Sequence, residues 1–131
     1  MEFSYNLEAT VNYSVSKKYP SSLIAIKELI IREYEDLTEE KLSEIFTPED
    51  AEAIVIDVDE VEKLVASEEN RLLNKSIDSA FAAIDKSGKV YIVLVEFRCN
   101  YERLKRLKRK DLIDKVQMSI TLLGNNVQIL E

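Results

Sequence analysis

The sequence predicts a single α/β domain in which helices flank a mixed sheet. Three observations predict this class: apolar residues that alternate near the N-terminus, a hairpin signal around Gly88, and apolar residues at helical spacing elsewhere. The chain has 131 residues, of which 46% are hydrophobic. A domain commonly holds roughly 100–150 residues. Neither a repeat nor a linker interrupts the chain, so we expect residues 1–131 to fold as one unit.

Apolar and polar residues alternate without a break over residues 3–16. A period of two predicts a long strand with one buried face and one solvent-facing face. Such a strand suits an antiparallel or mixed sheet rather than a fully buried parallel one. The predicted buried face consists of Phe3, Tyr5, Leu7, Ala9, Val11, Tyr13 and Val15.

Three helical segments are expected next. Ser21 is a suitable N-cap for the first, over about residues 21–37. The apolar stripe of this helix has helical spacing and consists of Leu23, Ile26, Ile30, Tyr34 and Leu37. A short helix over 38–46 follows Thr38, and Thr47 with Pro48 begins another.

Residues 53–66 fit two structures. Residues 53–56 form a short apolar run that is typical of a buried strand, whereas Ile54, Val58, Val61 and Val65 have helical spacing. We favour a strand over about 53–58 followed by a helical turn or two, and then a polar connection over 67–75.

The clearest tertiary signal is a β-hairpin. Residues 85–89 have the composition of a three-residue loop in which Gly88 adopts the left-handed conformation. The loop predicts strands over 76–85 and 89–99 whose paired residue numbers sum to 174, so that Asp78 faces Glu96. A helix capped by Asp111 and a last strand over 127–130 should follow the hairpin.

The composition excludes several kinds of site. The chain has no histidine, which removes imidazole bases and histidine-ligated metals. Cys99 is the single cysteine, so there is neither an internal disulfide nor a cysteine zinc cluster. Two glycines are too few for a phosphate-binding glycine loop. One cysteine and the absence of a signal-like N-terminus indicate the cytoplasm.

Charge is divided unevenly along the chain. Residues 1–70 hold 6 Lys and Arg and 18 Asp and Glu, whereas residues 71–131 hold 12 and 7. The net charges of the two parts are therefore −12 and +5. Either the basic part binds an anion, or the two parts attract each other within one chain or between two chains.

One group of residues has the composition of a catalytic site. In the predicted register Asp78 and Glu96 are neighbours on adjacent strands, and Arg98 lies on the same face. Facing carboxylates repel each other unless a positive group lies between them. A divalent cation such as Mg²⁺ can take that place, and so can Arg98 as a structural salt bridge.

The arrangement of these residues resembles the PD-(D/E)xK nuclease superfamily over about residues 76–130. The resemblance implies a restriction-endonuclease-like core, with the long N-terminal strand as an addition. It implies that Asp78 and Glu96 bind Mg²⁺, that Arg98 stands in the lysine position, and that Gln117 matches a glutamine of some members. The chain departs from the pattern because an arginine cannot accept a proton. Lys115 on the next helix is an alternative amine.

A basic run follows the hairpin. It consists of Arg103, Lys105, Arg106, Lys108, Arg109 and Lys110. The run is either a phosphate-contacting surface near the acidic pair or a solvated face balanced by the acidic part of the chain.

Three functions remain open from the sequence. The first is a Mg²⁺-dependent nuclease, and the second is an inactive relative that still binds DNA or RNA. The third is a small acidic protein-interaction module, such as an adaptor, an inhibitor or a chaperone, that forms a homodimer. Because no apolar run approaches the roughly 20 residues of a membrane span, no membrane partner is expected.

Overall fold

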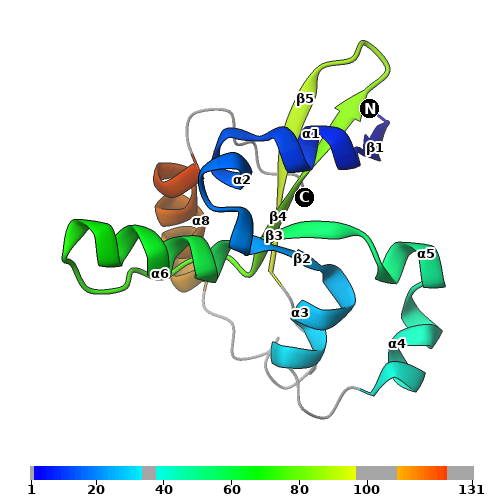
Figure 1. The fold of residues 1–131 in the computed structure, drawn as a ribbon, viewed down its shortest axis with the longest axis horizontal. Helices are drawn as coiled ribbons and strands as arrows, with labels where there is room; N and C mark the ends of the chain where they lie inside the picture. Colours follow the sequence, from blue (N-terminus) through cyan, green and yellow to red (C-terminus); the bar gives the residue numbers. More distant parts are fainter. Residues whose placement is uncertain (1, 34–37, 97–108, 124–131) are drawn as a thin grey trace.

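The computed structural model describes residues 2–33, 38–96 and 109–123 and shows an α/β fold (Figure 1). A five-stranded sheet is flanked by helices, as predicted. Its strands are β1 (Phe3–Tyr5), β2 (Leu23–Ala25), β3 (Ile54–Asp57), β4 (Ser79–Asp85) and β5 (Val90–Val95). The helices are α1 (Leu7–Asn12), α2 (Ser14–Lys18), α3 (Ile26–Glu33), α4 (Glu39–Ile45), α5 (Pro48–Ala51), α6 (Val58–Glu69) and α8 (Arg109–Leu123), with a 3₁₀ turn η1 (Pro20–Ser22).

Strand β4 lies at the centre of the sheet. Strand β5 pairs along one side of it, while β1 and β3 share the other side at opposite ends, and β2 extends the sheet beyond β3. All four pairings between described strands are antiparallel, whereas the sequence predicted a mixed sheet. The predicted last strand over 127–130 lies outside the described residues.

The predicted hairpin and its register are confirmed. The N–H of Gly88 donates to the carbonyl of Asp85 at 3.0 Å, and the N–H of Asp85 donates to the carbonyl of Lys89 at 3.1 Å. Gly88 has a φ of +84°, in the left-handed region that favours glycine. The paired residues run from Ile84↔Val90 to Ser79↔Val95, which is the predicted alignment. The first strand begins at Ser79 rather than at the predicted residue 76, so Asp78 and Glu96 lie just beyond the paired residues.

The predicted long N-terminal strand is wrong beyond Tyr5. Helix α1 begins at Leu7, because the side chain of Asn6 accepts a hydrogen bond from the N–H of Ala9 at 2.7 Å and caps it. Burial also differs from the predicted pattern at two positions. Thr10, on the predicted polar face, is fully buried, while Leu7, on the predicted apolar face, is 53% exposed.

The predicted helix over 21–37 is also partly wrong. Residues 23–25 form β2, which pairs with β3, and α3 begins only at Ile26. The predicted cap at Thr47 is confirmed, and Thr38 caps the helix that was expected to follow it. Each side chain accepts a backbone N–H three residues on, at 3.2 Å. Residues 34–37 lie outside the description.

Residues 54–57 form the predicted strand, but the helix after it is longer than expected. Asp57 caps α6 by accepting the N–H of Glu60 at 3.3 Å. Asn70 ends the helix in the left-handed conformation, so residues 67–69 of the expected connection are helical. Helix α8 begins two residues before its predicted cap, Asp111.

Two apolar clusters pack against opposite faces of the sheet, because alternate strand residues point to opposite sides. Helices α6 and α8 cover one face, and α3 and α4 cover the other. The first cluster includes Ile56, Val58, Val61, Ala80, Ile92 and Leu123. The second includes Leu29, Ile30, Leu42 and Val55. None of the described helices combines the length and apolar character that a membrane crossing demands.

Candidate functional site

The confirmed register brings the two acidic residues of the hairpin to the same end of the sheet. Asp78 directly precedes β4 and Glu96 directly follows β5, next to the terminal pair Ser79↔Val95. Even-numbered residues of this hairpin, such as Ala80, face the cluster formed with α6 and α8. Asp78 is half-buried, and the side chain of Glu96 is 8% exposed. Both carboxylates therefore belong to the α6–α8 side.

Helix α8 contributes an amine to this end of the sheet. The Nζ of Lys115 lies 3.0 Å from Oε2 of Glu96, and 25% of the Lys115 side chain is exposed. The hydroxyl of Ser119, one turn further on, accepts the N–H of Ile77 at 2.8 Å. This buried hydrogen bond fixes α8 against the residue that precedes Asp78.

A third carboxylate belongs to the same region, although the sequence analysis did not single it out. Asp59 lies in the first turn of α6, and the hydroxyl of Ser76 donates a hydrogen bond to it. Burial raises the pKa of Asp59, and the charges of Asp78 and Asp57 raise it further. The Ser76 hydrogen bond and the charge of Lys115 act in the opposite direction. The interactions link Asp59 to both Asp78 and Lys115.

A cavity of about 230 Å³ adjoins Asp59. Four carboxylates line it against two cations, Arg32 and Lys63, and Arg32 forms an ion pair with Asp57. The acidic residues of the lining are Asp57, Asp59, Glu60 and Glu62. Their excess charge attracts cations and repels phosphate groups. An anionic substrate therefore requires additional positive charge at this site.

The donor set of the hairpin end fits a hard cation. Mg²⁺ is usually held by one or two carboxylates together with waters and substrate phosphates, and Asp78 and Glu96 supply two carboxylates. Within the described parts of the chain, no group of three or more His, Cys, Asp or Glu side chains is placed to hold a metal together. A cation at this site would therefore rest on two protein carboxylates, one of which also contacts Lys115.

The remaining predicted site residues are divided between two groups. Gln117 lies on α8 with an exposed side chain, two residues from Lys115, and positions two apart on a helix do not share a face. Arg109 and Lys110 form the start of α8. Five basic residues lie outside the described part of the chain: Arg98, Arg103, Lys105, Arg106 and Lys108.

Comparison of the chain with protein-family models, curated proteins and solved structures finds no match. The chemistry of the site therefore rests on its own side chains. These provide two carboxylates at the end of a hairpin, an ammonium group in contact with one of them, and a third carboxylate on α6.

Proposed function

We propose that the protein hydrolyses phosphodiester bonds with a divalent cation, Mg²⁺, held by Asp78 and Glu96. One observation carries the proposal: the Nζ of Lys115 lies 3.0 Å from Glu96 Oε2. A carboxylate pair alone is common in proteins, but a carboxylate pair with an adjacent amine has the three groups that such hydrolysis uses. Lys115 also removes the difficulty that Arg98 cannot accept a proton.

Each residue then has a distinct role. When bound, Mg²⁺ would polarise the phosphoryl oxygen and lower the pKa of a coordinated water. Asp78 and Glu96 hold the cation, and Lys115 orients the attacking water or stabilises charge on the phosphate. Because the neighbouring cavity is acidic, the basic run over 103–110 is the expected contact for the phosphates of DNA or RNA. We propose the cytoplasm as the location, which suits a chain with one cysteine.

The first experiment is calorimetric titration of Mg²⁺ and Mn²⁺ into the wild-type protein, Glu96→Gln and Asp78→Asn. Glu44→Gln, an exposed change on α4, is the matched control. We expect binding in the wild type and the control, and loss of binding in both site variants. A folded wild-type protein that binds neither cation would contradict the proposal.

The second experiment follows cleavage of labelled single- and double-stranded DNA and RNA with each cation. Cleavage should require the cation and disappear in Lys115→Met, while the circular dichroism spectrum stays unchanged. Binding of nucleic acid without cleavage, weakened by added salt, would instead identify an inactive relative.

A protein-interaction module is the second candidate function, because two adjacent leucines point to solvent. Leu72 is 90% exposed and Leu73 is 60% exposed. Exposed apolar side chains that lie together often mark contact surfaces. If a second copy of the chain covers them, sedimentation should show a concentration-dependent dimer that Leu72→Ser with Leu73→Ser dissociates. A strict monomer at all concentrations would argue against the homodimer.

A further inference from the structure

The strand edge of β5 that faces away from β4 has no protection of its own. Strand β5 pairs with β4 along one side, and none of the residues that the structure describes pairs along the other side. The strand reads Val-Tyr-Ile-Val-Leu-Val and contains neither a charged residue nor a proline. Natural proteins protect a free strand edge with charges, with proline or with a covering segment. Because β5 has neither charge nor proline, its outer edge requires a cover.

The pairing of β4 with β5 shows which backbone groups point to this outer edge. Ala82 lies opposite Ile92. The N–H of Ala82 donates to Thr10 and its carbonyl accepts from Asn6, both on the side of β4 that faces away from β5. Opposite residues of an antiparallel pair either bond to each other or both point away from each other. Ile92 therefore directs its N–H and carbonyl to the outer edge, and so does Leu94, two residues on.

The outward-pointing backbone of Ile92 is shielded from water. Exposure falls from 47% at Val90 to 1% at Ile92. Buried backbone N–H and carbonyl groups almost always have hydrogen-bond partners. The second half of β5 therefore requires a hydrogen-bonding neighbour at its outer edge, whereas the first residue of the strand can be satisfied by water.

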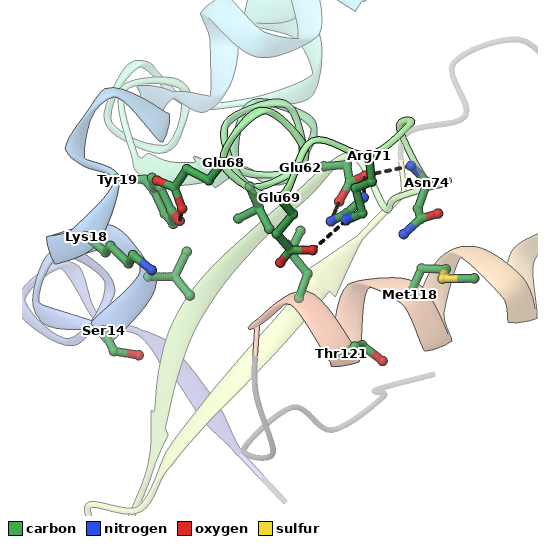
Figure 2. A pocket seen from close by; sticks show the side chains of 13 residues that line it. Ser14, Lys18, Tyr19, Glu62, Glu68, Glu69, Arg71, Asn74, Met118 and Thr121 are labelled. Carbon is green, nitrogen blue, oxygen red and sulfur yellow. Dashed lines mark hydrogen bonds and ion pairs between the residues drawn. The ribbon is translucent and has the colours of Figure 1, made fainter.

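Helix α8 leads the chain to this part of the sheet. The side of the helix that faces the sheet consists of Val116, Ser119 and Leu123. Met118 and Thr121, on another side of the helix, line a pocket toward α6 (Figure 2). Leu123 is 3% exposed, belongs to the apolar cluster that contains Ile92, and accepts a hydrogen bond at its carbonyl from the hydroxyl of Tyr13. The chain therefore leaves α8 on the α6–α8 side of the sheet, next to the layer that holds β5.

The segment after α8 has the composition of the required neighbour. Residues 127–130 read Val-Gln-Ile-Leu, a pattern that predicts a strand, and they carry no charge. Residues 124–126 connect them to α8 and consist of a glycine and two asparagines, which are common in turns. Three residues extend to about 10 Å, which is similar to the spacing of packed layers. The basic run over 103–110 is less suitable, because it would place charges along an apolar edge.

We propose that the outer edge of β5 is a strand-docking surface and that residues 127–130 of the same chain occupy it. The segment adds a strand to the sheet and bonds to the outward N–H and carbonyl groups of Ile92 and Leu94. Occupation closes the edge to strands of other molecules, which is the hazard of an unprotected edge. The proposal is independent of the phosphodiesterase activity and stands without it.

NMR of the full chain tests the pairing residue by residue. Native-state hydrogen exchange should show protected amides at Ile92 and Leu94, because both are hydrogen-bonded across the outer edge. Nuclear Overhauser effects should connect the backbone protons of these two residues with those of residues 127–130. These effects decide the question even if a variant of the segment does not fold.

Two proline variants test the strand geometry. Successive strand residues direct their N–H groups to opposite edges, so only one of Gln128→Pro and Ile129→Pro removes a group that bonds to β5. That variant should accelerate exchange at Ile92 at least about fivefold, the effect of one lost hydrogen bond. The other variant is its matched control, since an edge strand tolerates proline where the N–H faces solvent. The amide of Val93 faces β4 and should keep its protection in both.

Four outcomes would overturn the proposal. Fast exchange at Ile92 in the wild type would show that the edge is open. Absence of contacts with residues 127–130 would assign the cover to another segment, and equal effects of the two prolines would exclude strand pairing. Protection that falls on dilution, together with a dimer in sedimentation, would identify a second copy of the chain as the occupant.

Discussion

The hydroxyl of Thr10 accepts a hydrogen bond from the backbone N–H of Ala82 at 2.9 Å, at a position closed to solvent. The same hydroxyl donates to the carbonyl of Asn6 at 2.7 Å, and the N–H of Asn6 donates to the carbonyl of Ala82 at 2.9 Å. The start of α1 therefore supplies hydrogen-bond partners for the N–H and the carbonyl of Ala82 on β4, where β1 has already ended. A strand partner is unnecessary at this point.

Replacing Thr10 by valine should destabilise the protein, since valine keeps the shape and removes the hydroxyl. The buried N–H of Ala82 would lose its partner, at a cost of about 1–3 kcal/mol. Chemical denaturation measures the change in the free energy of unfolding. Thr121→Val is the control, because its exposed hydroxyl donates only to the carbonyl one turn earlier. Equal stability of the two variants would show that Thr10 does not carry this role.

The same hydrogen bonds explain why the N-terminal segment was mispredicted. Alternation over 3–16 is a valid strand signal, but it treats Thr10 and Ser16 as solvent-facing. In the structure both are buried and hydrogen-bonded, Ser16 by donating to the carbonyl of Thr10 at 2.7 Å. A buried hydroxyl that pairs with the backbone of a distant strand, as that of Thr10 does, cannot be recognised from a local pattern. The hairpin, by contrast, depends on a local turn around Gly88 and was predicted with the correct register.

The residues of the candidate site also differ in how far the sequence could place them. Asp78 and Glu96 come to the same end of the sheet through the hairpin, whose register is encoded within a few residues. Asp59 could not be assigned to the site, because its approach to Asp78 depends on how α6 packs after β3. An acidic residue directly after a strand and at the start of a helix was the available signal.

Replacing each of two buried serines by alanine should change the free energy of unfolding in opposite directions. The hydroxyl of Ser79 is fully buried and has no hydrogen-bond partner among the described residues, whereas that of Ser119 accepts the N–H of Ile77. Ser79→Ala should therefore raise the free energy of unfolding by about 1 kcal/mol, and Ser119→Ala should lower it by about 1–3 kcal/mol. Urea denaturation compares them directly. A loss of stability in Ser79→Ala as large as in Ser119→Ala would mean that Ser79 has a partner.

Arg71→Met should be among the most destabilising single changes in the described part of the chain. It leaves the carboxylate of Glu62, whose side chain is 5% exposed, without its cation, and a carboxylate held away from solvent is strongly unfavourable when its partner is removed. Arg71→Lys should recover only part of this, because an ammonium cannot form the paired hydrogen bonds of a guanidinium. Lys63→Met, an exposed change on α6 next to Glu62, is the control.

The stability that Arg71 provides through Glu62 should depend on pH. Its hydrogen bonds lower the pKa of Glu62, and the backbone N–H of Asn74 adds to the effect. A lowered carboxyl pKa contributes stability that is complete above the ordinary glutamate value of about 4.3. This contribution disappears as the pH falls through the lowered value. The difference between wild type and Arg71→Met should therefore shrink below about pH 4, and a constant difference would contradict the assignment.

Asp59→Asn should stabilise the protein at neutral pH, in contrast to Arg71→Met. Burial is the main cause of the raised pKa of Asp59, so the folded protein holds this proton more tightly than the unfolded chain. Its ionisation therefore destabilises the fold as the pH rises above the ordinary aspartate value of about 3.9. Asp59→Asn should unfold at higher urea than the wild type at neutral pH, and the advantage should vanish in acid. An advantage that persists in acid would exclude ionisation as its cause.

The central position of β4 also determines when the sheet can assemble during synthesis. Strand β1 pairs with residues 83–85 and β3 pairs with residues 79 and 80, so neither reaches β4 until more than half of the chain has been made. Until then, the backbone edge of β3 that will pair with β4 has no native partner on the nascent chain. A truncated chain that ends between residues 58 and 78 and is released from the ribosome would therefore present an open strand edge to chaperones and to neighbouring chains.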